Sequence, residues 1–146
     1  MFKFVIKKAK QKDLNSILKL SHILELDNLE NEDKIKYATE AGLVWVAKIA
    51  DEIVGYCLVE LFDEKHAKLP NSIFLSDLFV MEGYRNHGVG RQLVKMALKH
   101  KYPEQYTYFS VTHDPTESHL TKFYENFGFK VVGKTEAGNV KMIKAP

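Results

Sequence analysis

Two glycines, at positions 88 and 90, are the residues whose type and spacing point most directly to chemistry. They stand between Arg85 and Arg91, after a strand-like run and at the start of an amphipathic helical pattern. A glycine costs a helix about 1 kcal/mol relative to alanine, so two of them need a reason. The first N–H groups of a helix have no partner within the helix and carry partial positive charge, which suits a bound phosphate. Missing side chains would let a diphosphate approach these N–H groups, and the arginines would add charge at the rim.

Two common phosphate-binding loops do not fit this segment. The dinucleotide pattern G-x-G-x-x-G requires a glycine at position 93, where the chain has Leu93. A P-loop could begin at Gly83 and use Gly88, but Val89 and Gly90 then stand where that motif requires Lys and Ser or Thr. The alternative without a ligand is a tight strand-to-helix turn, which needs one glycine and no arginine.

The pattern that does fit is [Gln/Arg]-x-x-Gly-x-[Gly/Ala], written here as Arg85-Asn86-His87-Gly88-Val89-Gly90. With "DLFVMEGY" before it and "GRQLVKMALKH" after it, the segment resembles the acyl-CoA diphosphate loop of the GNAT superfamily of N-acyltransferases. The resemblance implies that acetyl-CoA is the co-substrate and that the loop, with Arg91 beside it, binds the diphosphate. It also implies that backbone groups of Leu78, Phe79 and Val80 hydrogen-bond the pantetheine arm.

The resemblance extends along nearly the whole chain. "SHLTKFYENFGF" is similar to a later helix of the family, and Phe123-Tyr124 and Gly128-Phe129 match its pattern. Ser118 stands where the family usually has an asparagine, which implies a cofactor contact from this position. "FLSDLFVMEGYRNHGVG" looks closest to the diamine and spermidine/spermine acetyltransferase branch, although Ser76 replaces the first acid of that branch and Asp77 keeps the second.

Acyl transfer from a thioester to an amine needs a neutral amine, a polarised carbonyl and a proton for the departing thiolate. An alkylamine with a pKa of about 10.4 is almost wholly protonated at neutral pH, so a carboxylate or an ordered water should remove a proton. Asp77 and Glu60, both on predicted strands, are the candidate bases. The alternative for Asp77 is a structural carboxylate that caps backbone groups or pairs with an arginine. A backbone N–H near Val80 would polarise the carbonyl.

Tyr124 is the candidate acid that protonates the thiolate, and the family match at this position favours that role. Its alternative is a place in the core. Leu120, Phe123, Tyr124 and Phe127 have the i, i+3, i+4, i+7 spacing of a buried helical stripe.

A second feature is an acidic segment, whose members are Glu25, Asp27, Glu30, Glu32 and Asp33. In the GNAT fold this region covers the acceptor side of the cleft, so an acidic rim would attract a cationic amine. The alternative is a solvated helix face or loop. The single cysteine, Cys57, is expected to be a small buried hydrophobe. His113 and His119 lack the spacing of a zinc site, and no metal is expected.

The elements that must position these residues follow from periodicity and punctuation. Strands are expected at 3–9, 43–49, 53–62, 72–81, 106–113, 130–136 and 139–145, and helices at 13–24, within 25–42, from about 88 to 101 and at 114–129. Asp13 and Asp114 should cap helices and Gly42 should end one. The two strands that flank the helix after Gly90 should pair in parallel. The fold class is therefore α+β, a mixed and mostly antiparallel sheet with helices on both faces. The resemblance implies the GNAT version, in which the sheet splays between two parallel strands.

Composition sets the remaining limits. The chain has 146 residues, of which 45% are hydrophobic and 27% charged, so residues 1–146 are expected to form a single N-acetyltransferase domain. The net charge of +2 and the dispersed basic residues argue against a nucleic-acid partner. No apolar run reaches the length of a membrane span or a signal peptide, and one cysteine fits a reducing compartment, so a cytoplasmic protein is expected.

The function expected from these residues is acetyl-CoA-dependent acetylation of a primary amine on a small cationic acceptor, either polyamine-like or amino-acid-like, by direct transfer in a ternary complex. One alternative is a silent acyl-CoA sensor or interaction module. Another is a protein or peptide N-acetyltransferase. Homodimers are common in such folds.

Overall fold

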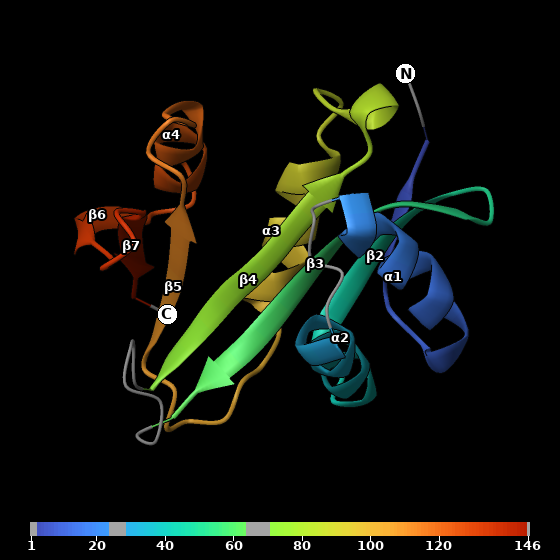
Figure 1. Cartoon of the computed structure of the whole chain (residues 1–146), viewed down its shortest axis with the longest axis horizontal. Helices are drawn as coiled ribbons and strands as arrows, with labels where there is room; N and C mark the ends of the chain where they lie inside the picture. Colours follow the sequence, from blue (N-terminus) through green and yellow to red (C-terminus); the bar gives the residue numbers. More distant parts are fainter. Residues whose placement is uncertain (1–2, 24–28, 64–70, 146) are drawn as a thin grey trace. The chain divides into compact units, whose positions relative to one another are not determined.

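The computed structural model describes residues 3–23, 29–63 and 71–145 (Figure 1). Two compact units are recognised, one formed by Met1–Val59 and Asp77–Lys101 and the other by Glu60–Ser76 and Tyr102–Pro146. Strands β3 and β4 each pass from one unit to the other.

The elements alternate in the order expected from the sequence. They are β1 (Val5–Lys8), α1 (Leu14–Ile23), α2 (Leu29–Glu40), β2 (Val44–Ile49), β3 (Glu52–Phe62), β4 (Ser72–Val80), α3 (Val89–Lys99), β5 (Tyr108–His113), α4 (His119–Glu125), β6 (Lys130–Lys134) and β7 (Val140–Lys144), with short 3₁₀ turns η1 (Gln11–Asp13) and η2 (Glu82–Tyr84). The seven strands form one sheet in the order β1-β2-β3-β4-β5-β7-β6. β4 and β5 pair in parallel, whereas β1–β2, β2–β3, β5–β7 and β6–β7 pair antiparallel. The predicted α+β class is confirmed.

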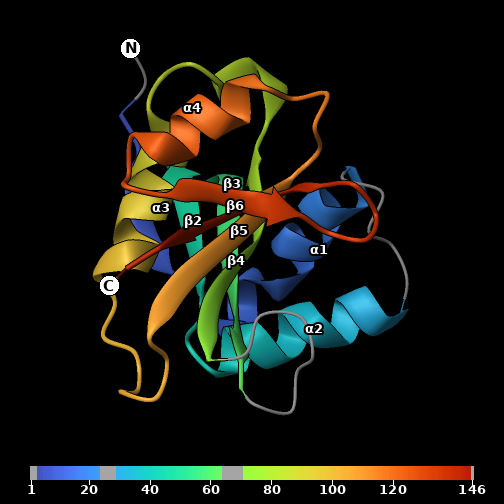
Figure 2. The same ribbon diagram turned by 90° about the vertical axis from the view of Figure 1, so that its left-hand side faces the viewer.

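In the first unit, helices cover both faces of the strands. α1 and α2 lie on one face of β1 to β3, and α3 lies on the opposite face (Figures 1 and 2). β3 is therefore buried without interruption from Ile53 to Val59, as expected for a strand covered on both sides. Gly55 permits a close approach to β4, because a β-carbon there would lie 2.7 Å from the carbonyl oxygen of Phe79.

A tryptophan and a histidine meet at the end of α3. The ring of His100 lies edge-on to Trp45, with their centroids 5.4 Å apart. Burial, followed by the positive charge of Lys8, lowers the pKa of His100. The folded protein therefore favours the neutral imidazole.

The second unit contains β5, β6 and β7, with α4 packed on β6. The parallel register joins Ser72–Phe74 of β4 to Tyr108–Ser110 of β5. Buried side chains form its core: Phe109, Val111, Tyr124, Phe129 and Met142.

One predicted helix start and one predicted N-cap are wrong. The last helix begins at His119 instead of Asp114, because the Asp114 carboxylate accepts hydrogen bonds from the N–H and the hydroxyl of Thr116 and holds a turn. Asp13 precedes α1, but its carboxylate accepts hydrogen bonds from the Lys10 N–H and from the Lys48 ammonium. The end of α2 is predicted correctly, since Gly42 follows it with a φ of 75°.

Two further expectations concern the chain as a whole. No helix in the described part of the chain is long and apolar enough to span a membrane. The single domain over residues 1–146 and the splay of the sheet remain predictions.

Candidate functional site

The glycine-rich loop connects β4 to α3, and Gly88 is the residue immediately before the helix. Gly88 has a φ of 83°, in the left-handed region that favours glycine. A β-carbon at this position would meet no atom of the described residues within 4 Å. At Gly90 a β-carbon would make an ordinary contact, 3.7 Å from Cγ2 of Val80. The open space beside Gly88 is compatible with the predicted diphosphate cradle.

The N-terminus of α3 supplies donors beside this space. The first bond of the helix runs from the Gln92 N–H to the Gly88 carbonyl, at 3.1 Å. The N–H groups of Val89, Gly90 and Arg91 precede that bond and so lack an acceptor within the helix. Val89 is buried and anchors the turn, whereas Arg91 is exposed. The chemistry of this donor set suits the phosphates of coenzyme A.

Arg85 is fixed at the end of β4. Its Nε donates a hydrogen bond to the carbonyl oxygen of Val80 at 2.8 Å, and its guanidinium lies 5.8 Å from the ring centroid of Phe79. Asn86 and His87, like Arg85, are exposed in the loop. Leu78 and Val80 are half-buried, on the face of β4 opposite to that of the buried Phe79.

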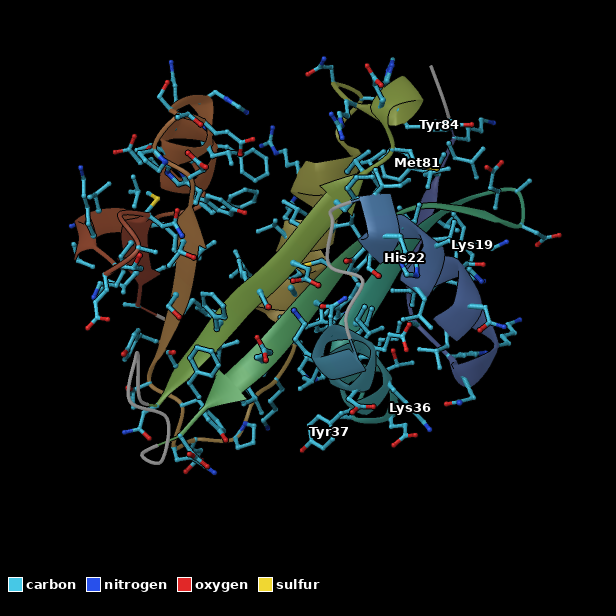
Figure 3. All side chains as sticks on the ribbon, in the orientation of Figure 1. Lys19, His22, Lys36, Tyr37, Met81 and Tyr84 are labelled. Atoms are coloured by element: carbon cyan, nitrogen blue, oxygen red, sulfur yellow. The ribbon has the colours of Figure 1, made fainter. Side chains whose placement is uncertain are left out.

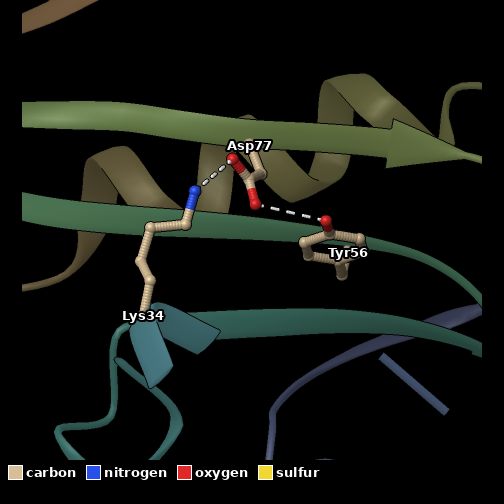
Figure 4. A network of polar contacts seen from close by, with 3 residues as sticks. All are labelled: Lys34, Tyr56 and Asp77. Atoms are coloured by element: carbon tan, nitrogen blue, oxygen red, sulfur yellow. Dashed lines mark hydrogen bonds and ion pairs between the residues drawn. The ribbon is translucent and has the colours of Figure 1, made fainter. Parts of the chain in front are cut away.

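Asp77 lies on β4 in the same unit, within a buried polar network (Figure 4). Its Oδ1 accepts a hydrogen bond from Nζ of Lys34 at 3.0 Å, and its Oδ2 accepts one from the hydroxyl of Tyr56 at 3.2 Å. Burial, and then the charge of Asp77, raise the pKa of Tyr56 far above its usual range, so the phenol keeps its proton and acts as a donor. The same two causes raise the pKa of Cys57 to about 12, so the buried thiol is no nucleophile at neutral pH.

Lys34 was missed by sequence reasoning. It lies on α2, directly after the acidic segment, and it is 43 positions from Asp77 in the chain. The alternative expected for Asp77 was pairing with an arginine. The cation found is a lysine, from a helix that no local motif links to β4.

Tyr124 belongs to the second unit, together with Glu60 and Ser118. Tyr124 is buried, and its ring lies edge-on to those of Phe123 and Phe129, with centroids 5.0 and 5.7 Å away. Of the four residues in the expected core stripe, all of them described, it is the one that is buried. Glu60 is half-buried on β3, and Ser118 is exposed just before α4.

His113, which the sequence analysis considered only as a metal ligand, links the end of β5 to α4. Nδ1 of His113 lies 2.9 Å from the carbonyl oxygen of Asp114, and Nε2 lies 2.8 Å from the hydroxyl oxygen of Thr121. A carbonyl only accepts, so Nδ1 carries the proton and, in the neutral ring, Nε2 accepts from Thr121. This bond lies one helical turn before Tyr124.

The remaining candidates are a metal site and the acidic segment. The described residues contain no cluster of three or more His, Cys, Asp or Glu that could hold a metal ion. In the acidic segment, Glu25, Asp27 and the side chain of Glu30 lie outside the described residues. Glu32 is half-buried and Asp33 is exposed on α2.

Solved structures share this fold over almost the whole chain. An N-acetyltransferase PaiA from Thermoplasma acidophilum in complex with coenzyme A matches with a TM-score of 0.70 and 18% identity, over 99% of this chain and 100% of that one. A second match is the diaminobutyrate acetyltransferase EctA from Paenibacillus lautus, bound to its substrate L-2,4-diaminobutyric acid and coenzyme A. Its TM-score is 0.76 and its sequence identity 12%, over 100% of this chain and 96% of that one. Naa50 from Arabidopsis thaliana, in complex with a bisubstrate analogue, matches with a TM-score of 0.74 and 20% identity, over 98% of this chain and 99% of that one.

Comparison of sequences identifies the family. No curated protein sequence gives a significant match. The family model described as "Acetyltransferase (GNAT) domain" matches residues 40–131, which include β4, the glycine-rich loop and α4. The chain therefore belongs to the GNAT acetyltransferase family and is an acyl-CoA N-acyltransferase.

Proposed function

We propose that this enzyme transfers an acetyl group from acetyl-CoA to a primary amine of a small cationic acceptor, by direct transfer in a ternary complex. The observation that carries the proposal is the arrangement of β4. The glycine-rich loop that is predicted to bind phosphate follows this strand. A buried carboxylate three residues before the end of the strand is paired with a primary ammonium, that of Lys34. The fold shared with an enzyme bound to diaminobutyric acid supports an acceptor of this class.

The roles of the residues follow from the balance of the reaction. Acetyl-CoA supplies the activated acetyl group. The acceptor ammonium must lose a proton before its nitrogen can attack, and Asp77, Glu60 or a water would take it. The new N–C bond then replaces the C–S bond, the nitrogen gives up a second proton, and the leaving thiolate gains one. Tyr124 would donate that proton when held within hydrogen-bond reach of the sulfur, because a phenol with an ordinary pKa of about 10 still carries its proton at neutral pH.

The cofactor contacts proposed for this chain are those of the loop and the strand before it. The N–H groups at the start of α3 would bind the diphosphate, with Arg85 and Arg91 at the rim. Backbone groups of β4 between Leu78 and Val80 would bind the pantetheine arm. A contact from Ser118 would come from the second unit.

A peptide N-terminus is the second candidate acceptor. Naa50, solved with a bisubstrate analogue that carries the sequence MVNAL, shares this fold with a TM-score of 0.74. The terminal ammonium of a peptide could pair with Asp77 as a diamine could. The two acceptor classes therefore differ in the groups that surround this nitrogen.

The test is thiol release from acetyl-CoA over a panel of putrescine, spermidine, diaminobutyric acid, single amino acids and a Met-Val-initiated peptide. The proposal expects the diamines to give the highest kcat/KM. A higher kcat/KM for the peptide would instead identify a peptide N-terminus as the acceptor class. Tight binding of CoA without release by any amine would support a silent sensor and refute the proposed function.

A further inference from the structure

The two side chains of the ion pair between Lys34 and Asp77 differ in their exposure to solvent. The Asp77 side chain is 4% exposed, while that of Lys34 is 24% exposed. Tyr56, the partner of the other carboxylate oxygen, is fully buried. Of these two partners, Lys34 is the one with access to solvent.

Charge balance limits what can take the place of that ammonium. A buried carboxylate that loses its cation is left uncompensated, which is costly. Another primary ammonium brings the same charge and the same three N–H donors, so an exchange leaves Asp77 satisfied. A neutral molecule offers neither the charge nor the full donor set.

The two partners of Asp77 differ in their freedom to leave. Lys34 reaches the carboxylate from α2 on a flexible four-carbon stem and is partly exposed. Tyr56 is fixed in the middle of β3, and its ring lies 6.5 Å from that of Phe79. Of these two partners, Lys34 is therefore the one that can be exchanged for another cation.

We propose that Lys34 is an internal occupant of the acceptor's ammonium subsite on Asp77, and that the cationic nitrogen of the acceptor displaces it on binding. This inference rests on the proposed function and adds a residue that sets acceptor affinity and selectivity. A cationic acceptor competes with Lys34, whereas an uncharged one cannot replace it. Acylation removes the positive charge from the acceptor nitrogen. The amide product then loses its pairing with Asp77, and Lys34 returns.

Kinetics of one variant and its matched control test the exchange. Lys34→Met removes the charge and keeps an unbranched side chain. Lys36→Met makes the same change two positions away on α2, where the side chain points away from the helix into solvent (Figure 3). Loss of the internal competitor should lower KM for putrescine about fivefold, the equivalent of about 1 kcal/mol for a partly exposed ion pair. Lys34→Arg keeps the charge and should not lower KM.

The outcomes separate this inference from the proposed function. Lys36→Met should leave KM unchanged. If Lys34→Met has a wild-type or raised KM while the wild-type enzyme turns over putrescine, the Lys34 inference fails and the proposed function stands. If no amine is acetylated by the wild-type enzyme, the proposed function fails.

A measurement of lysine signals in the wild-type protein does not depend on turnover, and it needs only the charge-conserving Lys34→Arg variant for assignment. In CoA-bound protein carrying ¹⁵N-lysine, the side-chain ammonium signal of Lys34 can be identified by its absence from the spectrum of Lys34→Arg. Addition of putrescine should move this signal to the position of solvated lysines such as Lys36. A Lys34 signal that stays in place at saturating putrescine would overturn the inference.

Discussion

Substitution of Gly88 by asparagine tests the cradle without disturbing the fold. Gly88 has a φ of 83°, which most residues avoid, but asparagine tolerates this region, and Asn86 in the same loop already has a φ of 65°. A β-carbon at Gly88 enters open space in the described structure. We therefore expect Gly88→Asn to lower the free energy of unfolding by at most about 1 kcal/mol.

The effect on coenzyme binding should be much larger. The new side chain would lie in front of the first N–H groups of α3 and keep the diphosphate from at least one of them. A hydrogen bond to a charged group contributes about 1.5–3 kcal/mol, so the Kd for CoA should rise about ten- to hundredfold. Gly88→Val should weaken binding at least as much and should also destabilise the fold, because a β-branched residue is strained at this φ.

Isothermal titration with CoA, beside a thermal melt, measures both effects. Gly83→Ala is the matched control, since Gly83 lies in η2 before the same loop and a β-carbon there also has open space among the described residues. Gly83→Ala should bind CoA like the wild type. If Gly88→Asn melts normally and binds CoA as tightly as Gly83→Ala, the cradle lies elsewhere.

Three further changes probe the acid, the strand contact and the titrating ring. Tyr124→Phe keeps the buried ring and removes the hydroxyl, so kcat should fall about ten- to hundredfold with no change in the Kd for CoA. An unchanged kcat in a steady-state assay would exclude Tyr124 as the acid that protonates the thiolate. Gly55→Ala would place a β-carbon 2.7 Å from a backbone oxygen of Phe79. The substitution should therefore lower the free energy of unfolding by about 1–3 kcal/mol, as measured by urea titration. A wild-type urea midpoint would refute this expectation. The lowered pKa of His100 means that the unfolded chain takes up the proton first as pH falls below 6.5, so stability should be full above that pH and decline below it. Fluorescence of Trp45, the only tryptophan, should follow this change, and a His100→Asn variant that keeps the same decline would contradict it.

The order of strands and helices could be predicted because local signals mark each boundary. Gly42 ends α2 with the backbone conformation that its type predicts, and the strands expected at 43–49 and 53–62 form and pair antiparallel. The start of α4 was wrong for an equally local reason. The Asp114 side chain can cap a helix or hold a turn with Thr116, and spacing alone does not tell which bond forms.

The site divides in the same way. The loop around Gly88 could be predicted, because glycine spacing, a preceding strand and a following helix are all properties of one short segment. Lys34 could not, because its contact with Asp77 depends on how α2 packs against the sheet. Tyr124 lies between these cases. Its burial agrees with the core alternative, and its place in the family pattern favours the catalytic one, so only the Phe variant separates them.

The central claim is that bare backbone N–H groups at the start of α3 bind the diphosphate of coenzyme A. A crystal structure of the protein with CoA tests it most directly. We expect phosphate oxygens within about 3.2 Å of backbone nitrogens between Gly88 and Arg91, with the diphosphate filling the space beside Gly88. A diphosphate bound elsewhere, with that space left to solvent, would contradict the account.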